Sequence, residues 1–238
     1  MHIVLIGYGK MGRMIEEIAE ERGHEIVLRI DADNQDDFTE GKMKTANVAI
    51  EFTAPESAYE NVKKCIDFGI PVVSGTTGWN KRLAEVKQYC LEKRGTFLHA
   101  SNFSIGVNIF FQVNKLLAQL MAIHPEYRVG IKEIHHTQKK DAPSGTAVTL
   151  AEQIQEHLTN KKTWVNHPTE ETDQLEIISE RIDPAPGTHH VTYASAIDTI
   201  EIIHTAHNRK GFAMGAVLAA EYIYNKRGVF TIEEALGF

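Results

Sequence analysis

The stretch at residues 133–146, EIHHTQKKDAPSGT, gathers side chains that can transfer protons and bind anions. His135 and His136 are adjacent, and Lys139 and Lys140 follow them closely. A histidine exchanges its proton near neutral pH, whereas a lysine does so only after a large pKa shift. We therefore expect His135 to act as a general acid and Lys139 to act beside it, where it binds a substrate carboxylate and polarises the substrate.

The end of this stretch has the features of a helix start. Pro143 and Ser144 suit the entry and the cap of a helix. Its apolar positions follow at helical spacing, namely Ala147, Leu150, Ala151, Ile154 and Leu158. The backbone N–H groups of Ser144, Gly145 and Thr146 have no partner inside such a helix, and groups of this kind bind anions. The alternative is a solvated polar loop before a capped helix, which is the commoner role for each of these residues taken singly.

A glycine-rich turn near the N-terminus indicates a second site. Gly7, Gly9 and Gly12 form the pattern G-x-G-x-x-G between an apolar run, HIVLIG, and a segment with helical periodicity, KMGRMIEEIAEERG. In this context the first glycine permits a tight turn, the second lets the backbone approach a pyrophosphate, and the third lets the helix pack on the strand. We expect dinucleotide binding here, and a purely structural turn is the alternative.

Asp31, at the end of the second predicted strand, bears on the choice of dinucleotide. Its carboxylate can accept hydrogen bonds from a ribose 2′-hydroxyl, which favours NADH. The next residue is Ala32 and not an arginine, so no adjacent cation is available for a 2′-phosphate, although Lys10 or Arg13 could approach one. We expect NADH or NADPH as cofactor, with a preference for NADH. An aspartate that only begins a solvated loop is the alternative.

Two further loops follow apolar strands. They run from Ser74 to Gly78 and from Ala100 to Ser104, and ligands of parallel sheets bind beyond the carboxyl ends of the strands. Small residues with backbone donors suit a nicotinamide ribose and carboxamide, and an aromatic ring at Phe103 could wall the nicotinamide. The residues that we expect there are Gly75, Thr76, Thr77, Ala100, Ser101, Asn102 and Phe103.

The order of the predicted elements indicates an α/β fold. Strands alternate with helices over residues 1–103, which predicts a doubly wound parallel sheet of the Rossmann type. From residue 104 a long apolar helix leads into the strands LEIISERI, THHVTYASAI and DTIEIIHTAH, which follow one another without helices and predict a mixed sheet. We expect a dinucleotide-binding domain at 1–103, completed by 209–238, and a mixed α/β substrate-binding domain at 104–208.

Composition narrows the partners and the compartment. The chain of 238 residues is 42% hydrophobic and has a formal net charge of −7, so no global field attracts nucleic acid. No segment reaches the roughly 18 apolar residues of a membrane helix, and no secretory leader precedes the first strand. Cys65 and Cys90 fall within predicted helices, where we expect buried free thiols. These observations predict a cytoplasmic protein that binds neither nucleic acid nor a membrane.

The remaining histidines have weaker claims to function. His189 and His190 stand in an alternating strand, and we expect them to be half exposed rather than catalytic. His204 and His207 end a later strand, where core or surface roles are the expectation. No His-Glu-x-x-His motif or paired-cysteine spacing occurs, so we expect no metal site.

Five motifs resemble one known family. GYGKMG, EFTAPE, GTTG, HASNFSIGVN and above all HHTQKKDAPSGTA are similar to sequences of the bacterial 4-hydroxy-tetrahydrodipicolinate reductases, formerly called dihydrodipicolinate reductases, and the similarity spans nearly the whole chain. The resemblance implies an NAD(P)H-dependent reduction of 4-hydroxy-tetrahydrodipicolinate, by way of dihydrodipicolinate, to tetrahydrodipicolinate in diaminopimelate and lysine biosynthesis. It also implies a homotetramer that is built by the second domain.

The same resemblance implies a role for each site residue. His135 protonates the substrate ring after hydride transfer with Lys139 as its partner, and His136, Gly145 and Thr146 hold the two substrate carboxylates. The implied cofactor positions are Gly7, Gly9, Lys10, Met11, Gly12, Asp31 and the loops Gly75–Thr77 and Ala100–Phe103.

Two other classes of function stay open from the residues alone. One is a different two-domain dehydrogenase of a small anionic metabolite such as an amino-acid semialdehyde. The phosphorylating type needs a nucleophilic cysteine at a strand-to-helix turn, and Cys65 and Cys90 are predicted in mid-helix. The other is a non-enzymatic dinucleotide sensor, which needs no proton donor. A sensor that regulates transcription should show a basic DNA-binding face, and none is evident.

Overall fold

Two units make up the chain in the computed structural model, which describes residues 1–238 throughout. The N-terminal unit contains Met1–Ile105 and Lys210–Phe238, and the C-terminal unit contains Gly106–Arg209. The domain limits expected at 103 and 209 lie two residues before Ile105 and one residue before Lys210. The last segment of the chain therefore returns to the first unit.

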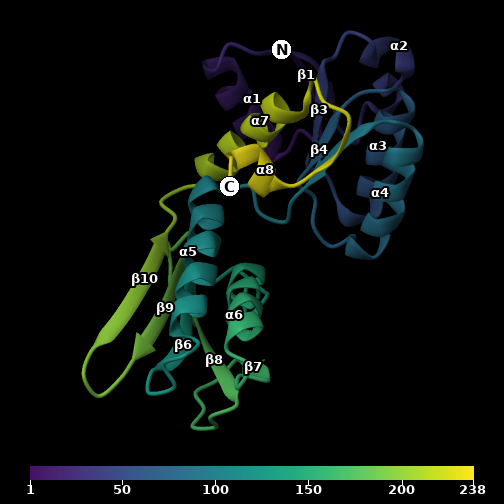
Figure 1. Cartoon of the computed structure of the whole chain (residues 1–238). Coiled ribbons are helices and arrows are strands. Elements are labelled where there is room, and N and C mark those ends of the chain that lie inside the picture. The colour runs from purple at the N-terminus through teal and green to yellow at the C-terminus, as the bar shows by residue number, and fades with distance from the viewer. The chain divides into compact units, whose positions relative to one another are not determined.

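A six-stranded parallel sheet forms the centre of the N-terminal unit (Figure 1). Its strand order is β11-β5-β4-β3-β1-β2, and every neighbouring pair is parallel. The strands are β1 (His2–Ile6), β2 (Glu25–Ile30), β3 (Val48–Glu51), β4 (Val72–Ser74), β5 (Thr96–His99) and β11 (Gly228–Phe230). Their carboxyl ends meet at one edge, and the order reverses between β1 and β3, where such sheets bind dinucleotides.

Helices cover both faces of this sheet (Figure 1). One face packs against α1 (Lys10–Glu21) and α7 (Lys210–Ile223), and the other packs against α3 (Pro55–Asp67) and α4 (Leu83–Glu92). The shorter elements of the unit are α2 (Glu40–Met43), α8 (Ile232–Leu236) and the 3-10 turns Gln35–Asp37 and Asn80–Arg82. The doubly wound parallel sheet predicted from the sequence is confirmed.

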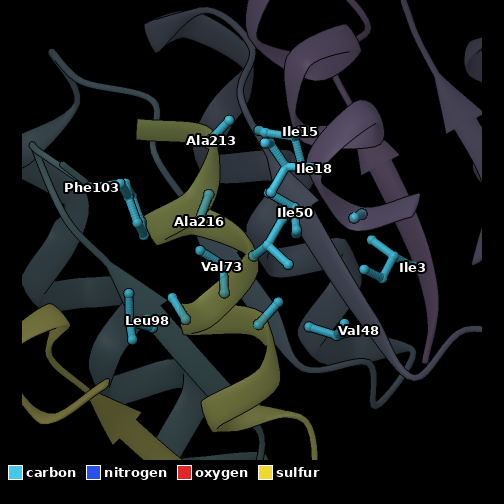
Figure 2. Close-up of a cluster of buried hydrophobic side chains, with 14 of the residues drawn as sticks. Ile3, Ile15, Ile18, Val48, Ile50, Val73, Leu98, Phe103, Ala213 and Ala216 are labelled. Atoms are coloured by element: carbon cyan, nitrogen blue, oxygen red, sulfur yellow. The ribbon is translucent and has the colours of Figure 1, made fainter. Parts of the chain in front are cut away.

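Alternation along the strands sorts the core residues between the two faces. Ile3 and Leu5 of β1 belong to the core under α1 and α7, whereas Val4 and Ile6 belong to the core under α3 and α4. Figure 2 shows the first of these cores, in which side chains of the sheet meet those of α1 and α7, among them Ile3, Ile50, Val73, Leu98, Ile15, Ile18, Ala213 and Ala216. Each buried isoleucine or leucine contributes about 1.5–3 kcal/mol relative to exposure, so these two layers hold the loops at the sheet edge on a rigid base.

A five-stranded mixed sheet forms the C-terminal unit, in the order β10-β9-β6-β8-β7. The central strand β6 is antiparallel to β9 and parallel to β8, β10 is antiparallel to β9, and β7 is parallel to β8. The strands are β6 (Arg128–His135), β7 (Thr163–Val165), β8 (Gln174–Arg181), β9 (Thr188–Ala194) and β10 (Thr199–Thr205). The mixed sheet predicted from the successive strands is confirmed.

Two helices pack against one face of this sheet, α5 (Ile105–Met121) and α6 (Gly145–His157). They share one core with Val129 and Ile131 of β6 and with residues of β8 and β9. All the apolar positions predicted for α6 are buried, namely Ala147, Leu150, Ala151, Ile154 and Leu158. The helix start that we predicted from the 133–146 stretch therefore lies against the buried face of the sheet.

No helix of the chain combines the length and the apolar composition that crossing a bilayer requires.

Cys65 in α3 and Cys90 in α4 are buried free thiols, as predicted. Burial raises the pKa of Cys65 far above its usual value and raises that of Cys90 to about 11. Neither thiol can serve as an accessible thiolate nucleophile, which counts against a semialdehyde dehydrogenase of the phosphorylating type.

Candidate active site

Strand β6 presents two ionisable side chains on one face. Glu133 and His135 are two positions apart, so both point to the side that α6 covers. Glu133 is fully buried and His135 is 7% exposed. His135 Nδ1 lies 3.2 Å from Glu133 Oε2. A carboxyl group therefore stands directly beside the histidine that we predict to be a general acid.

Glu133 accepts hydrogen bonds from two other elements. Its Oε1 accepts from Ser179 Oγ at 2.7 Å, from the backbone N–H of Ser144 at 3.1 Å and from Arg181 Nη2 at 3.2 Å. Burial by itself raises the pKa of Glu133, but contacts with His135 and the two serines outweigh it and hold this pKa well below its usual range. Glu133 is therefore a buried carboxylate anion at neutral pH.

The prediction of a half-exposed His189 is wrong. This side chain is only 4% exposed, because it lies opposite Glu133 in the register of β9 and β6 and faces the covered side of the sheet. Its ring meets the His135 ring edge to face with centroids 5.1 Å apart, and its Nε2 lies 3.9 Å from Glu133 Oε2. Burial, reinforced by His135, lowers the pKa of His189 to about 3, so the ring is neutral. The half-exposed residue is His190, which pairs with Glu201.

Arg181 ties the loop after β6 to this cluster. Its guanidinium donates to the carbonyl oxygen of Asp141 at 2.6 Å and to that of Lys139 at 3.3 Å, besides its bond to Glu133. Lys139 Nζ donates to both carboxylate oxygens of Asp141, at 2.8 and 2.9 Å. Burial raises the pKa of Asp141, but the ion pair with Lys139 outweighs it and leaves this pKa below its usual value. The Lys139 charge also acts on the pKa of His189, so it belongs to the same electrostatic environment.

The start of α6 joins the cluster through its cap. Ser144 is the N-cap residue, and its Oγ accepts the backbone N–H of Ala147 at 3.3 Å while its own N–H goes to Glu133. Gly145, the first helical residue, is exposed, and Thr146 after it is half buried. An exposed first turn can bind an anion through backbone N–H groups. His136 is half buried just beyond β6, so the stretch combines proton-bearing rings with an anion-binding helix start.

The glycine-rich turn of the N-terminal unit fits a dinucleotide. Gly7 has φ +92°, and a Cβ there would lie 2.0 Å from the carbonyl oxygen of Phe52. A Cβ on Gly12 would lie 2.3 Å from the carbonyl oxygen of Gly7. Gly9, in contrast, is the exposed N-cap of α1 with nothing within 4 Å of its Cβ position. The first and third glycines are thus required by packing, and the second leaves open space at a helix N-terminus, where a phosphate binds.

Two predicted cofactor residues follow Gly9 at the start of α1. Lys10 is exposed, and Met11 is half buried and packs against the core under α1 and α7. Both lie in the first turn of the helix. They are therefore placed where a group bound at the helix N-terminus would be within reach.

Asp31 follows β2 and is exposed at the start of an acidic loop. Two basic side chains close to it in the sequence are already paired, Arg29 with Glu16 and Lys42 with Asp37. A 2′-phosphate at this strand end would therefore be repelled by the carboxylate of Asp31, and neither Arg29 nor Lys42 is unpaired to neutralise it. This arrangement suits a ribose hydroxyl better than a phosphate.

A second buried carboxyl group shapes the loops after β3 and β4. Glu51 is fully buried and accepts hydrogen bonds from Ser74 Oγ at 2.6 Å, from Thr76 Oγ1 at 2.7 Å and from the backbone N–H of Thr53 at 3.0 Å. The hydroxyl of Thr53 donates to it as well. Thr76 is therefore buried with its hydroxyl turned inward. Of its two neighbours, Gly75 is half buried and Thr77 is exposed.

The loop after β5 alternates between buried and accessible residues. Ala100 and Phe103 are buried, Ser101 is exposed and Asn102 is half buried. The Phe103 ring belongs to the core of the unit, with its centroid 5.7 Å from that of Phe52. Its role beside a nicotinamide ring stays a prediction.

Four polar residues of these clusters were missed in the sequence: Glu133, Arg181, His189 and Glu51. Glu133 could have been found, because strand alternation places it on the same face as His135. Glu51 ends an apolar run, VAIE, where an acidic residue is unusual. Arg181 and His189 carry no local signal, since only the pairing of β8 and β9 with β6 brings them to the site.

Models of one family match both units. The model described as dihydrodipicolinate reductase, N-terminus, matches residues 1–103, and the model described as dihydrodipicolinate reductase, C-terminus, matches residues 106–236. The 4-hydroxy-tetrahydrodipicolinate reductase of Christiangramia forsetii is 48% identical over 237 residues, which cover 99% of this chain and 98% of the relative. The enzyme of the same name from Staphylococcus saprophyticus is 33% identical and covers 98% of this chain and 99% of its own.

Solved structures show the same fold at lower identity. A dipicolinate-bound dihydrodipicolinate reductase from Paenisporosarcina sp. TG-14 has a TM-score of 0.79 at 24% identity, with 98% of each chain covered. An amine dehydrogenase from Mycobacterium smegmatis has a TM-score of 0.64 at 11% identity, with 98% of this chain and 95% of that chain covered.

A parallel sheet with a glycine-rich turn and a mixed α/β unit with a buried histidine cluster, together with relatives that are 4-hydroxy-tetrahydrodipicolinate reductases, define the class as a two-domain NAD(P)H-dependent oxidoreductase. Within that class the chain belongs to the dihydrodipicolinate reductase family. Members of this family catalyse a reduction in diaminopimelate and lysine biosynthesis.

Proposed function

We infer that this chain reduces 4-hydroxy-tetrahydrodipicolinate, by way of dihydrodipicolinate, to tetrahydrodipicolinate with NADH or NADPH. One observation carries the chemical part of the proposal. In the C-terminal unit the imidazole of His135, the carboxylate of Glu133 and the capped start of α6 at Ser144 form one buried cluster. The substrate is inferred from the relative that is 48% identical over 99% of the chain.

The N-terminal unit holds the cofactor in this proposal. Gly7, Gly9 and Gly12 bind the pyrophosphate at the start of α1, and Asp31 accepts hydrogen bonds from the adenosine ribose. The bound nicotinamide supplies the hydride of the reduction. The loops at 75–77 and 100–103 line the ribose and the carboxamide of the nicotinamide. Lys10 and Met11 also contact the cofactor, from the first turn of α1.

In the C-terminal unit His135 supplies the proton. After hydride addition to the conjugated C=C–C=N system, the adjacent carbon takes the proton from His135. Lys139, His136 and the first-turn N–H groups of Gly145 and Thr146 bind the two carboxylates and so orient the ring, which accounts for much of the rate enhancement. Dipicolinate, which the Paenisporosarcina structure holds, also carries two carboxylates on a ring, and this supports the substrate class.

A variant at His135 tests the proton donor directly. With enzymatically generated substrate and nicotinamide absorbance as the readout, His135→Gln should lower kcat by about 10²–10³-fold while NADH binding stays unchanged. His190→Gln is the matched control, because His190 lies on the opposite face of the same sheet and pairs with Glu201. A His135→Gln enzyme that turns over at the wild-type rate with saturating substrate would exclude this assignment.

Lys139→Ala should raise KM for the substrate and lower the rate, because the variant loses the charge that binds a carboxylate. Lys132→Ala serves as its control, since Lys132 pairs with Glu180 away from the cluster. Unchanged kinetics for Lys139→Ala would remove this residue from the substrate site.

Preference for NADH over NADPH forms part of the same proposal. The carboxylate of Asp31 disfavours a 2′-phosphate. Arg29 pairs with Glu16 and Lys42 pairs with Asp37, so neither cation is unpaired to offset the repulsion between Asp31 and the phosphate. We expect kcat/KM with NADH to exceed that with NADPH by about tenfold, which corresponds to about 1.4 kcal/mol. A strong preference for NADPH would contradict the role given to Asp31.

Assembly into a homotetramer through the C-terminal unit is supported by one surface. On α5 an apolar stripe at helical spacing is between 42% and 60% exposed and consists of Ile109, Val113, Leu116 and Leu120. A stripe of this kind is buried most readily by another copy of the chain. Leu116→Glu should lower the molar mass measured by light scattering, whereas Gln88→Glu, an exposed position of α4, should leave it unchanged. A tetramer that persists in Leu116→Glu would place the interface elsewhere.

A cytoplasmic location completes the proposal. It is supported by the two free thiols, Cys65 and Cys90, which fit a reducing compartment. Cell fractionation with the reductase assay tests it, and activity found mainly outside the cytoplasmic fraction would contradict it.

A further inference from the structure

The ring of His135 is held from two sides. Glu133 lies at one edge, with Oε2 3.2 Å from Nδ1, and His189 lies against the ring with an angle of 72° between the two ring planes. The other edge faces Gly187, where a Cβ would lie 3.0 Å from Nε2. One ring nitrogen therefore meets a buried carboxylate, and the other meets backbone that carries no side chain.

We propose that Glu133 and His189 are positioning residues that keep a proton on Nδ1 of His135 in both its charged and its neutral form and leave Nε2 as the atom that transfers a proton to the substrate. This inference rests on the proposed function, because it takes His135 as the proton donor. It adds the atom that donates, the tautomer that remains and the two residues that determine both.

The hydrogen bonds of Glu133 leave one oxygen for His135. Oε1 accepts from Ser144, Ser179 and Arg181, whereas Oε2 has no hydrogen bond of this kind. His135 Nδ1 is likewise buried without another hydrogen-bond partner. Two buried polar atoms that lie 3.2 Å apart and have no other partner are satisfied together by one proton between them, after a small rotation of the ring.

His189 completes the arrangement without adding charge. Its Nε2 lies 3.2 Å from Ser144 Oγ, and burial keeps the ring neutral. It therefore restricts rotation of His135 by ring contact and does not repel the protonated form. The other charged or titratable groups around the two histidines are Arg181 of β8, Lys139 and Asp141 of the loop after β6, and His204 of β10.

The proton transfer that follows balances at each atom. His135 begins as a cation with protons on both nitrogens. The Nε2–H bond breaks, and a C–H bond forms at the substrate carbon with the electron pair that hydride addition leaves there. The ring becomes neutral and keeps its Nδ1 proton directed at Glu133, and solvent returns a proton to Nε2. Without the carboxylate the cation is less stable, and the neutral ring divides between its two tautomers.

A metal ion is the competing occupant of this cluster. Glu133, His135 and His189 offer ligand atoms within 4.8 Å of one another. Arg181, however, already brings a positive charge within 3.2 Å of the same carboxylate, which disfavours a second cation. A proton shared by Glu133 and His135 needs no further charge, so the protonated arrangement is the one that the surroundings favour.

Kinetics test the inference through Glu133→Gln, which keeps the size of the side chain and removes its charge. We expect kcat to fall by about 10–100-fold while KM for the substrate and the Kd for NADH change less than about threefold. The profile of kcat against pH should change as well, because the carboxylate beside Nδ1 is no longer charged. Glu133→Asp, which restores the charge, should return the profile toward that of the wild type.

Glu180→Gln is the matched control, since Glu180 lies on β8 and pairs with Lys132 on the opposite face. It should leave both kcat and the pH profile unchanged. If Glu133→Gln keeps the wild-type kcat and pH profile while His135→Gln is inactive, the positioning role is wrong and the proposed function stands. If His135→Gln keeps its rate, the proposed function itself fails.

A spectroscopic readout on the wild-type chain makes the test independent of how well the variants fold. Long-range proton–nitrogen correlation spectra of ¹⁵N-histidine-labelled enzyme report which ring nitrogen carries the proton, and His135→Gln assigns the signal. In the resting enzyme above the titration of His135 we expect a protonated Nδ1. We expect a mixture of tautomers in Glu133→Gln and in His189→Gln. A proton found on Nε2 of the wild-type enzyme would overturn the inference, as would activity that chelation abolishes and zinc restores.

Discussion

Glu51 in the N-terminal unit and Glu133 in the C-terminal unit are both fully buried at or near the ends of strands, but they are surrounded by different chemistry. Glu51 accepts hydrogen bonds only from uncharged donors, among them the hydroxyls of Ser74 and Thr76. Glu133 accepts from the guanidinium of Arg181 and stands beside two imidazoles. The first carboxyl group ties loops together, whereas the second lies among groups that can gain or lose protons.

This difference separates the two tasks of the enzyme. Thr53 and Thr76 lie in loops at the sheet edge where a dinucleotide binds, so the hydroxyl bonds of Glu51 give these loops a fixed shape without introducing a titrating base. Proton transfer, which we propose for His135, instead needs a charge close to the donor, and in that proposal the carboxylate of Glu133 supplies it. A buried carboxyl group therefore indicates a functional site only together with the donors around it.

Replacing each carboxyl group by leucine should give the largest effect and the clearest contrast. Glu133→Leu leaves Arg181 largely buried without its anion, which should cost about 3–5 kcal/mol of unfolding free energy. Glu51→Leu leaves hydroxyls that can partly satisfy one another, since the Thr53 N–H already donates to Thr76 Oγ1 at 2.8 Å. We expect about 1–3 kcal/mol for that variant.

The chain allows this contrast to be measured unit by unit. Its two tryptophans are Trp79 in the N-terminal unit and Trp164 in the C-terminal unit. In a Trp79→Phe background the fluorescence of urea unfolding reports the C-terminal unit, and in a Trp164→Phe background it reports the N-terminal unit. Equal losses for Glu133→Leu and Glu51→Leu would mean that charged and neutral surroundings do not differ in the way described.

Elements with local signals are predictable from the sequence. The helix start at Ser144 follows from a capping residue and from apolar positions at helical spacing, and each of these is where it was expected. The turn of Gly7, Gly9 and Gly12 follows from a local spacing of glycines between a strand and a helix, although the close approach of Phe52 to Gly7 also depends on the pairing of β3 with β1. The parallel sheet follows from strands that alternate with helices.

The histidine cluster could be predicted only in part, because its members meet through strand pairing. Alternation along β6 relates Glu133 to His135 locally, but His189 reaches them only because β9 pairs with β6 in a register that sets His189 opposite Glu133. A shift of that register by one residue would set His190 there instead, and nothing within β9 itself decides between the two. The burial of His189 is therefore a property of the sheet and not of its own sequence neighbourhood.

Acid should destabilise the C-terminal unit through His189, and this effect is smaller than that of Glu133→Leu. The pKa of His189 is lowered from 6.5 to about 3 in the folded chain, so between these pH values the unfolded chain binds more protons. Stability therefore falls as pH falls through this window, with a slope that approaches about 1.4 kcal/mol per pH unit. The lowered pKa of Glu133 adds a loss of the same sign below about pH 4.3, the usual value for glutamate.

Urea unfolding in the Trp79→Phe background, repeated from pH 7 to pH 5, excludes Glu133, which does not yet contribute there. His204 of the same unit, whose pKa burial also lowers, contributes with the same sign, so the comparison of variants identifies the share of His189. His189→Gln should flatten the dependence on pH, and His190→Gln, the half-exposed neighbour, should not. An unchanged slope in His189→Gln would mean that His189 accepts a proton in the folded chain.

Glu51→Gln should produce the smallest effect and the sharpest separation of the two carboxyl groups. The amide nitrogen of glutamine cannot accept the hydrogen bonds that one oxygen of Glu51 now accepts, so the loops at Thr53 and Thr76 lose part of their fixed shape. A loss of about 1 kcal/mol in cofactor binding corresponds to an increase of about fivefold in the Kd for NADH, measured by fluorescence titration. The value of kcat and its pH profile should stay as in the wild type, because the groups around Glu51 do not supply the proton of the reaction.

Glu133→Gln should show the reverse pattern, with an altered kcat profile and an unchanged Kd for NADH. If both variants alter the same parameter, the division between a loop-shaping and a proton-positioning carboxyl group does not hold.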